Sequence, residues 1–400
     1  MKTVIVGGGA HSTPALFDSE WSLEAPQFSF ELVGRSPERL AAVARAIELV
    51  SGRRGAPADC RWRPMGTLAA ALAGVDVVLV QFRIGGYLAR VWDEVFPQRY
   101  ALCGDEGLGP GGLAAAWRTW DDLRGVLAAV DRVNPRATVV LLTSPIGILT
   151  RCARAAFPAL IIYGICELPW TTLRAVCSRA GVEPAASAYA YLAVNHIGWF
   201  SNVRVGDRQL VAADDVLPLK YVRLQDAPEE VLAEQRSSVP RGRQLSELAA
   251  EAFAVFERGE SANVAAAIAR RQTPWYAHAV APFLRSLSGD ETGVTYFLTA
   301  PNDGYCRYVD DADCIEMPFC VRDGRLERKM CADWQRDDVA VKVGSLVAYE
   351  RLAAVAVLER DTQKLKAAIG AHPWLRGAAV SDDLLSDIVA PVVPTATSRT

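Results

Sequence analysis

The sequence predicts an α/β protein that begins with a doubly wound parallel sheet and continues into an α+β domain of mixed sheet and helices. A short β-branched strand at 2–6 runs directly into three consecutive glycines. Near-continuous apolar runs recur at 75–80, 137–142 and 161–165, and helix-like segments separate them. Parallel strands covered on both faces have such runs. Repeated strand–helix units therefore indicate a Rossmann-like domain over residues 1–165, with its ligand crevice at the carboxyl ends of the strands.

Local signals predict the other elements of this first domain. A second strand is expected at 28–33, and the stretch after Thr13-Pro14 is compatible with a helix. Ser36 suits the N-cap, and Pro37 the first turn, of the helix that follows the second strand.

Past Ala188 the pattern changes to a mixed sheet with helices, and this arrangement resembles the C-terminal domains of lactate and malate dehydrogenases. We expect this second domain to span 166–388 and the tail at 389–400 to be disordered. Its expected strands lie at 189–194, 199–205, 293–300 and 313–321, and its expected helices at 228–257, 260–270, 275–288 and 338–370.

The composition excludes several classes of partner. The chain has 400 residues and a net charge of -3, with Lys and Arg scattered along it, so nothing attracts nucleic acid or an anionic membrane at long range. No apolar run approaches the roughly 18–20 residues that span a bilayer. Nine cysteines without a CxxC pair, and a start without signal-peptide features, favour a reducing compartment. We therefore expect a cytoplasmic enzyme with a small-molecule substrate.

The glycine-rich start predicts a dinucleotide site. A strand, a glycine turn and a helix N-terminus bring phosphates against bare backbone N–H groups. We therefore expect Gly7, Gly9, Ser12 and Thr13 to hold the cofactor. A tight turn without a ligand is the alternative.

The end of the second strand bears on which dinucleotide binds. The acidic residue that usually holds the ribose hydroxyls there is missing, and Gly34-Arg35-Ser36 takes its place. Arg35 could accept a 2′-phosphate, which favours NADP over NAD. The alternative is that the adenosine end is held less tightly.

The strands of the predicted sheet end in residues that carry chemistry, namely Arg83, Ser144, Cys166 and His196. Taken singly, a histidine is more often structural and a cysteine more often a small buried apolar residue. Because strand ends meet at one crevice, their joint placement favours a thiolate–imidazole metal pair with open positions for substrate oxygens. The glycine-dense loop at 104–112 predicts close approach of backbone to a ligand, with a flexible surface loop as the alternative.

Taken in chain order, the motifs resemble those of glycoside hydrolase family 4, the NAD- and Mn²⁺-dependent 6-phospho-glycosidases and their relatives. The segment GGGAHSTP resembles the family's GGGSxxTP loop, and FRIGGYLARVWDE its R-x-GG-x₃-R-x₂-DE segment. GDEGLGPGG stands at a GQETxGPGG loop, TSPIGILT at TNPAGxT, ICELPW at Cys-Asn-x-Pro and NHIGWF at Asn-His-x-x-Trp. RRQTPWYAHAV resembles RGGAxYSxxA, and the PND…IEMP segment resembles PNxG…VEVP. Eight or more such motifs in one order make the resemblance specific.

The resemblance implies a redox-assisted glycoside hydrolysis that departs from the two-carboxylate scheme. Bound NAD oxidises the sugar C3 hydroxyl, a tyrosine removes the acidified C2 proton, the aglycone leaves, water adds, and the ketone is reduced again. A cation on the ketone oxygen stabilises the charge that develops at C2. The implied ligands of Mn²⁺, or of another divalent ion, are Cys166 and His196.

Further roles are implied by position. Tyr221 is the first candidate for the base that removes the C2 proton, and Tyr276 and His278 are alternative candidates. Asp105 is implied as a second catalytic residue. Relatives form dimers or tetramers, so a homo-oligomer is expected by analogy.

The resemblance also implies contacts to substrate and cofactor. Arg83 and Arg271 would hold an anionic substituent bidentately. The remaining implied contacts are Glu167, Asn195 and Asn302 for the substrate, and Arg35 and Ser144 for the cofactor.

Several substrate-reading positions depart from the family pattern. The Asn after the metal cysteine is Glu167, the Asn of TNP is Ser144, and the Gln of GQET is Asp105. RGGA has become RQTP at residues 271–274. The scaffold and the metal pair persist while these positions do not, which indicates a divergent member whose substrate need not be a 6-phosphoglycoside.

Two alternatives to hydrolysis remain open. One is an NAD(P)-dependent sugar or cyclitol oxidoreductase, epimerase or lyase on the same scaffold. The other is a catalytically inactive relative that binds a nucleotide or sugar, against which the retained Cys166 and His196 argue.

Overall fold

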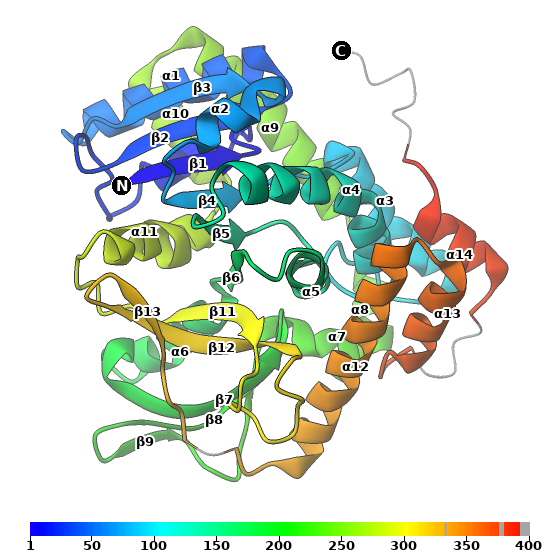
Figure 1. Ribbon diagram of the computed structural model, residues 1–400. Coiled ribbons are helices and arrows are strands. Elements are labelled where there is room, and N and C mark those ends of the chain that lie inside the picture. The colour runs from blue at the N-terminus through cyan, green and yellow to red at the C-terminus, as the bar shows by residue number, and fades with distance from the viewer. Residues whose placement is uncertain (333, 376–379, 393–400) are drawn as a thin grey trace.

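The strands of the computed structural model form one thirteen-stranded sheet, which runs through the whole molecule (Figure 1). The structure describes residues 1–332, 334–375 and 380–392. Most of the tail that the sequence predicts to be disordered therefore lies outside the described residues.

The first half of the sheet is the predicted doubly wound unit. Its strands are parallel and ordered β3-β2-β1-β4-β5-β6. Their bounds are β1 Lys2–Val6, β2 Ser29–Gly34, β3 Asp59–Pro64, β4 Val77–Val80, β5 Thr138–Leu141 and β6 Ile161–Cys166. The order reverses beside β1, so the ligand crevice is expected at the carboxyl ends of β1 and β4. The predicted fold class is confirmed in this half.

Two local features differ from the sequence-based expectation. The strand β3 was not predicted, because its sequence DCRWRP offers no apolar run; it pairs only with β2 at the sheet edge, where polar residues are tolerated. The helix expected after Thr13-Pro14 is a 3₁₀ helix of only four residues, Thr13–Leu16. The glycine loop therefore does not lead into a long helix.

The second half continues the same sheet with mixed pairing, as expected. The strand β11 (Tyr296–Pro301) pairs antiparallel with β6, and Leu298 lies opposite Ile165. Beyond it come β12 (Cys314–Arg322), β7 (Ser187–Val194) and β8 (Ile197–Val205), with the shorter strands β9 (Arg208–Val211), β10 (Leu217–Pro218) and β13 (Arg325–Arg328) alongside. The domain boundary predicted between residues 165 and 166 falls within β6 and stays a prediction.

Helices cover the sheet along its length, and α12 runs beside its lower half in Figure 1. The helices that border the crevice are α1 Pro37–Arg53, α3 Gly86–Val95, α4 Gly109–Val133, α5 Ile146–Ala156 and α9 Arg241–Arg258. The helix α6, Leu168–Arg179, begins directly after Glu167, which lines the cavity. The others are α2 Leu68–Leu72, α7 Arg223–Asp226, α8 Pro228–Ser237, α10 Ser261–Arg270, α11 Ala281–Leu287, α12 Asp337–Glu359, α13 Thr362–Ala371 and α14 Asp382–Val389. Within the described part of the chain, no helix is both long and apolar enough to cross a membrane.

Two predicted helices are each divided in the structure. The segment expected at 338–370 breaks at Arg360, which has a φ of 57° and ends α12 in the left-handed conformation. The segment expected at 228–257 breaks at Pro240, between α8 and α9. At 275–288 a π-helical turn, Tyr276–Val280, precedes α11. Such turns often mark functional sites, and this one borders the crevice.

Candidate active site

The loops after the parallel strands open into one large cavity of about 840 Å³. Its walls come from the glycine loop, the start of α1, the loops after β4, β5 and β6, the β7–β8 turn, α9 and residues 271–276. The sequence-predicted residues that line it are Gly7, Gly9, Ser12, Arg35, Arg83, Ser144, Cys166, Glu167, His196, Tyr221 and Arg271. A single cavity thus gathers most of the predicted site, at the place where open α/β sheets bind ligands.

The three glycines after β1 serve two purposes. Gly7 has a φ of 88°, and a Cβ there would lie 2.7 Å from the backbone N of Phe82. A Cβ at Gly8 would lie 2.8 Å from Leu32 Cβ. Gly9 lines the cavity, and the atom nearest to a Cβ there would be Arg39 Cβ, at 3.6 Å. The first two glycines therefore permit close packing, and the third leaves bare backbone facing the cavity.

The structure corrects the role expected for Thr13. This residue is fully buried, and its hydroxyl accepts a hydrogen bond from Gln81 Nε2 at 2.9 Å. Gln81 Oε1 in turn accepts one from the Tyr276 hydroxyl at 2.7 Å. Thr13 therefore holds Gln81 and Tyr276 in place behind the cavity surface, whereas its neighbour Ser12 lines the cavity.

Arg83 lies at the cavity but is already paired. Arg83 and Arg90 both bind the carboxylate of Glu106, Arg90 at 2.6 Å. Burial, together with the nearby Arg90, lowers the pKa of Arg83 to about 9. An anionic substrate would have to compete with Glu106 for these guanidinium groups.

Arg271 is the less neutralised of the two predicted anion-binding arginines. Its Nη1 donates to the Tyr87 hydroxyl at 2.9 Å, and its guanidinium carbon lies 5.2 Å from the centre of the Trp275 ring. No carboxylate pairs with it in the described part of the chain. Burial, and secondarily the charges of Arg271 and Arg39, lower the pKa of His11 to about 3, so His11 is neutral at pH 7 beside these two arginines.

Cys166, the last residue of β6, points into the cavity region beside Glu167. Its Sγ lies 4.0 Å from Glu167 Oε2. Burial, and secondarily Glu316 and Glu167, raise the pKa of the thiol well above its ordinary value, and burial also raises the pKa of Glu167. A nearby cation would reverse this preference and stabilise the thiolate.

His196 stands at the tip of the two-residue turn between β7 and β8. Its φ of 69° places it in the left-handed region, a conformation that costs a non-glycine residue on the order of 1 kcal/mol or more. Burial, Arg90 and Lys220 lower the pKa of its imidazole to about 4, so the ring is neutral at pH 7. Its Nδ1 is buried and has no hydrogen-bond partner among the described residues. A strained, neutral imidazole with an unsatisfied nitrogen suits a metal ligand.

Tyr221 packs face to face with His196. The ring centroids are 4.8 Å apart and the ring planes differ by 13°. Burial raises the pKa of the Tyr221 phenol, and the charge of Asp105 adds to the shift. The rivals for the base are less suitable, because the Tyr276 hydroxyl is bound to Gln81, and His278 contacts Arg174 outside the cavity lining.

Asp105 lies behind the cavity surface, close to Tyr221. Its carboxylate accepts a hydrogen bond from the backbone N–H of Gly107 at 2.8 Å, and burial raises its pKa. Two glycines of this loop permit close backbone packing, since a Cβ at Gly104 would clash with the Glu94 carbonyl and one at Gly111 with the Asp93 carbonyl. A Cβ at Gly107 would instead lie 3.6 Å from His196 Nδ1, so this glycine borders the histidine of the site.

The structure also corrects the substrate contact expected of Asn195. This residue is buried, and its Nδ2 donates to Glu316 Oε2 at 3.2 Å. The other oxygen of Glu316 accepts a hydrogen bond from Tyr191 at 2.6 Å. Asn195 also hydrogen-bonds to Cys166. It therefore connects the thiol to a buried carboxylate and does not line the cavity.

The substrate contact expected of Asn302 is corrected in the same way. Asn302 is fully buried, and its Nδ2 donates to the carbonyls of Cys306 and Val309 while its Oδ1 accepts from the Cys306 N–H. All of its hydrogen bonds stabilise the loop between β11 and β12. It does not line the cavity.

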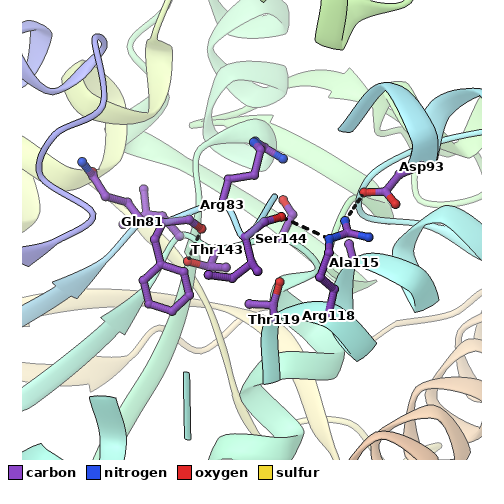
Figure 2. Close-up of a pocket in the computed structure, with 11 residues that line it drawn as sticks. Gln81, Arg83, Asp93, Ala115, Arg118, Thr119, Thr143 and Ser144 are labelled. Atoms are coloured by element: carbon purple, nitrogen blue, oxygen red, sulfur yellow. Dashed lines mark hydrogen bonds and ion pairs between the residues drawn. The ribbon is translucent and has the colours of Figure 1, made fainter. Parts of the chain in front are cut away.

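A small second cavity lies behind Arg83, next to Ser144 (Figure 2). Asp93 and Arg118 form an ion pair of 2.6 Å on one side of it, and Arg118 Nε donates to the Ile84 carbonyl at 3.1 Å. Burial raises the pKa of Asp93 to about 7 despite this pairing. The pair holds the loop that carries Arg83, which makes it a support for the site.

The donors around His196 fit a divalent metal. A thiol and a neutral imidazole line the same cavity, and this mixture of soft and borderline ligands is what first-row divalent ions accept. The described residues contain no cluster of three or more His, Cys, Asp or Glu side chains that could hold a metal. Cys166 and His196 would therefore act as a pair and leave positions for substrate oxygens.

Sequence reasoning missed three residues of the site. His11 lies in the motif GGGAHSTP, Glu106 in GDEGLGPGG and Glu316 in the IEMP segment, but the sequence predicted no role for any of them. A charged residue inside an apolar strand such as Cys314–Arg322 was the only available signal for Glu316, which is 0% exposed.

A doubly wound sheet whose strand ends surround one arginine-rich cavity, with a thiol and an imidazole inside it, defines a Rossmann-type enzyme. More particularly, the chain belongs to family 4 of the glycosyl hydrolases. Residues 2–181 match the model of the family 4 glycosyl hydrolases, and residues 209–375 match that of their C-terminal domain. The predicted resemblance is confirmed, and the chain is a glycosidase-like enzyme.

The similar proteins extend over nearly the whole chain. A 6-phospho-beta-glucosidase of Thermotoga maritima is 23% identical over 418 residues, which cover 97% of this chain and 98% of the relative. A structure of the Thermotoga maritima 6-phospho-beta-glucosidase with manganese, NAD⁺ and glucose-6-phosphate aligns with a TM-score of 0.83 at 22% identity, over 97% of each chain. A malate dehydrogenase of Plasmodium falciparum aligns at a TM-score of 0.55 and 10% identity, over 90% of this chain and 99% of the other, which confirms the predicted dehydrogenase-like architecture.

Proposed function

We propose that this protein hydrolyses glycosides with an anionic, phosphate-bearing sugar by a redox-assisted route, with a nicotinamide dinucleotide and Mn²⁺ or another divalent ion in its cavity. The relatives with solved structures bind NAD, manganese and glucose-6-phosphate. The observation that carries the proposal is the common cavity of Gly9, Cys166, His196 and Arg271, which gathers cofactor loop, metal pair and anion site.

When bound, a dinucleotide would supply hydride exchange at a sugar hydroxyl, and a divalent cation would supply the charge that acidifies the neighbouring C–H. The chain's own residues prepare these steps. Gly9 offers bare backbone for phosphates, and the thiol of Cys166 and the neutral imidazole of His196 offer ligands for the cation. Tyr221, stacked on His196, would take the C2 proton.

The anionic group of the substrate would bind at Arg271. Its guanidinium is fixed by Tyr87 and Trp275 and lacks a carboxylate partner among the described residues, whereas Arg83 is held by Glu106. A free, oriented guanidinium binds phosphate through charge-assisted hydrogen bonds. We expect Arg83 to contribute only after Glu106 has moved.

The same cavity would support a second outcome. The partly buried Glu167 stands beside Cys166 where family members have Asn, so an acid whose pKa is raised lines the cavity next to a proposed metal ligand. That observation favours an epimerase or lyase as the alternative. Without water addition, such an enzyme would release no free sugar.

Solvent exchange distinguishes these outcomes. The holoenzyme with NAD and Mn²⁺ is incubated in D₂O with p-nitrophenyl glycosides, with and without a 6-phosphate. Redox-assisted hydrolysis predicts nitrophenol release, deuterium at sugar C2, and no net reduced nicotinamide. Net accumulation of the reduced cofactor would instead establish an oxidoreductase. Unsaturated sugar without hydrolysis would establish a lyase.

A further inference from the structure

We infer that the adenosine end of the cavity selects a dinucleotide with a 2′-phosphate, so that the protein binds NADP(H) in preference to NAD(H). The inference rests on the proposed dinucleotide site and deepens it. The relevant residues stand at the end of β2 and the start of α1, where Gly34, Arg35, Ser36 and Arg39 line the cavity.

The segment from the end of β2 to the N-cap of α1 carries no carboxylate of its own. The described residues from the end of β2 to the N-cap of α1 are Val33, Gly34, Arg35 and Ser36, none of them acidic. NAD-binding Rossmann domains place an Asp or Glu at this strand end, whereas an arginine there accommodates a 2′-phosphate. The strand end therefore has the chemistry of the phosphorylated cofactor.

Gly34 fixes the geometry of this strand end. A Cβ at Gly34 would lie 3.3 Å from Leu40 Cδ2, so a side chain would press into the first turn of α1. A side chain at Gly34 would therefore require Leu40 to shift by a few tenths of an ångström, and the next residue, Arg35, lines the cavity beside it.

Two arginines bring positive charge to this end. Arg39 follows Arg35 by one helical turn and lies beside Gly9. Its guanidinium carbon is 5.3 Å from the centre of the Phe253 ring, and in the described part of the chain it has no carboxylate partner. It also contributes to the lowered pKa of His11. Arg39 is therefore an oriented and uncompensated cation beside the phosphate-facing loop.

The N-terminus of α1 adds a further anion-favouring element. This helix has 17 residues, and the Ser36 hydroxyl caps it by accepting from the Arg39 N–H at 3.2 Å. The partial positive charge of a helix N-terminus stabilises a phosphate in its vicinity. Glu38 is the acid nearby, and it does not line the cavity.

Asp122 of α4 offers the main competing explanation. Its Oδ1 lies 2.5 Å from Arg35 Nη2, and both side chains are substantially exposed, at 42% and 65%. Asp122 could itself accept the ribose hydroxyls, which would favour NAD. However, its carboxylate engages only one nitrogen of Arg35, and a guanidinium has five donors. We infer that Asp122 orients Arg35 for the 2′-phosphate.

Binding measurements test the inference without turnover. Dissociation constants of NADPH and NADH are measured by nicotinamide fluorescence, and adenosine 2′,5′-bisphosphate is compared with AMP as a competitor. We expect NADPH to bind the unmodified protein at least about 10-fold more tightly than NADH, the gain expected of one charge-assisted contact. Arg35→Ala and Arg39→Ala should each reduce this ratio, and Arg35→Asp should invert it. Arg45→Ala, on an exposed part of α1, is the matched control and should leave the ratio unchanged.

Each other outcome overturns the inference. Equal or tighter binding of NADH to the unmodified protein removes it while leaving the proposed glycosidase intact. A loss of NADH affinity in Asp122→Asn without any NADPH preference would assign the ribose to Asp122. If neither dinucleotide bound, the cofactor role in the proposed function would fail as well.

Discussion

The imidazole ring of His196 and the phenol ring of Tyr221 lie nearly parallel, with centroids 4.8 Å apart. This stacking joins two proposed roles, since one ring offers a ligand nitrogen and the other a base. It also limits how the imidazole can turn, because His196 occupies a left-handed turn and Tyr221 covers one face of its ring. The contributions of the ring and of the hydroxyl can therefore be separated by substitution.

Tyr221→Phe and Tyr221→Ala should have different effects. The phenylalanine keeps the stacked ring and removes the hydroxyl, so Mn²⁺ affinity should persist while turnover falls by about 10²- to 10⁴-fold, as expected for loss of a general base. The alanine should lower both. Isothermal titration with Mn²⁺ and the rate of C2 deuterium exchange measure the two quantities. Normal exchange in the phenylalanine variant would exclude Tyr221 as the base.

His196→Asn should abolish metal binding with little change in the turn. Asparagine tolerates positive φ, so the backbone of the β7–β8 hairpin should be preserved. We expect Mn²⁺ affinity to fall by more than the roughly 10- to 100-fold typical of changes to outer-shell residues. Cys166→Ser should behave similarly, whereas Cys60→Ser at the distant edge strand is the control. Dinucleotide affinity should stay within about twofold of the unmodified value in all three variants; undiminished Mn²⁺ binding by both site variants would refute the metal pair.

Glu316→Gln should weaken the metal site from a distance. Glu316 is completely buried, accepts a hydrogen bond from Asn195 and contributes to the raised pKa of the Cys166 thiol. Burial raises the pKa of Glu316 to about 8, and glutamine replaces one of the two oxygens that accept from Tyr191 and Asn195. Mn²⁺ affinity should therefore fall by about 10-fold, in the range seen for outer-shell partners. The exposed Glu257→Gln is a suitable control. An unchanged Mn²⁺ titration in a folded Glu316 variant would mean that Asn195 is oriented by Tyr191 and the backbone alone.

Arg271→Ala should act on the charge of the substrate. For a phosphorylated glycoside we expect KM to rise by about 10- to 100-fold, because a charge-assisted contact contributes about 1.5–3 kcal/mol. For the unphosphorylated glycoside KM should change little. The neighbouring Arg270→Ala, whose side chain is 58% exposed and pairs with Glu251, is the matched control. Equal losses for both glycosides would place the phosphate elsewhere.

His372 should make folding stability depend on pH. It is 0% exposed, and burial lowers its pKa to about 3. Neither ring nitrogen has a hydrogen-bond partner among the described residues, and Tyr349 and Trp374 pack edge-on against the ring. Protonation therefore favours the unfolded state, and stability is lost as pH falls from about 6.5 towards 3.

A phenylalanine at this position removes that dependence. At pH 5 the His372 contribution amounts to about 2 kcal/mol, since one pKa unit corresponds to 1.36 kcal/mol. Urea unfolding of the unmodified protein and of His372→Phe, each at pH 7 and pH 5, should show that the variant loses less stability on acidification. Parallel losses would show that His372 is accessible to protons in the native state.

Most of the fold could be predicted from the sequence because the parallel strands are buried on both faces. Runs such as Val77–Val80 are recognisable without their neighbours, whereas the edge strand Asp59–Pro64 is fixed only by its pairing with β2. The break at Arg360 was not predictable either. A residue other than glycine rarely adopts positive φ, and tertiary packing of α12 against α13 imposes it here.

The site could be predicted where chain position determines the role. Cys166 reaches the cavity because it is the last residue of the central strand β6, and His196 because it lies in the turn of the β7–β8 hairpin. The contacts predicted for Asn195 and Asn302 failed because hydrogen-bonding partners distant in sequence, or in a folded loop, occupy their amides. The ion pair between Arg83 and Glu106 likewise could not be predicted, because it joins two separate loops that come together only in the folded structure.

The antiparallel ladder between β6 and β11 has a consequence for dissecting the molecule. Phe297, Leu298 and Thr299 pair with the final residues of β6. A chain cut after the nucleotide-binding half would therefore leave β6 with an unpaired, apolar edge. Uncovered borders of this kind recruit other strands and promote aggregation. The two halves should therefore behave as one cooperative unit, and a truncated N-terminal fragment should be insoluble unless residues 296–301 are supplied in trans.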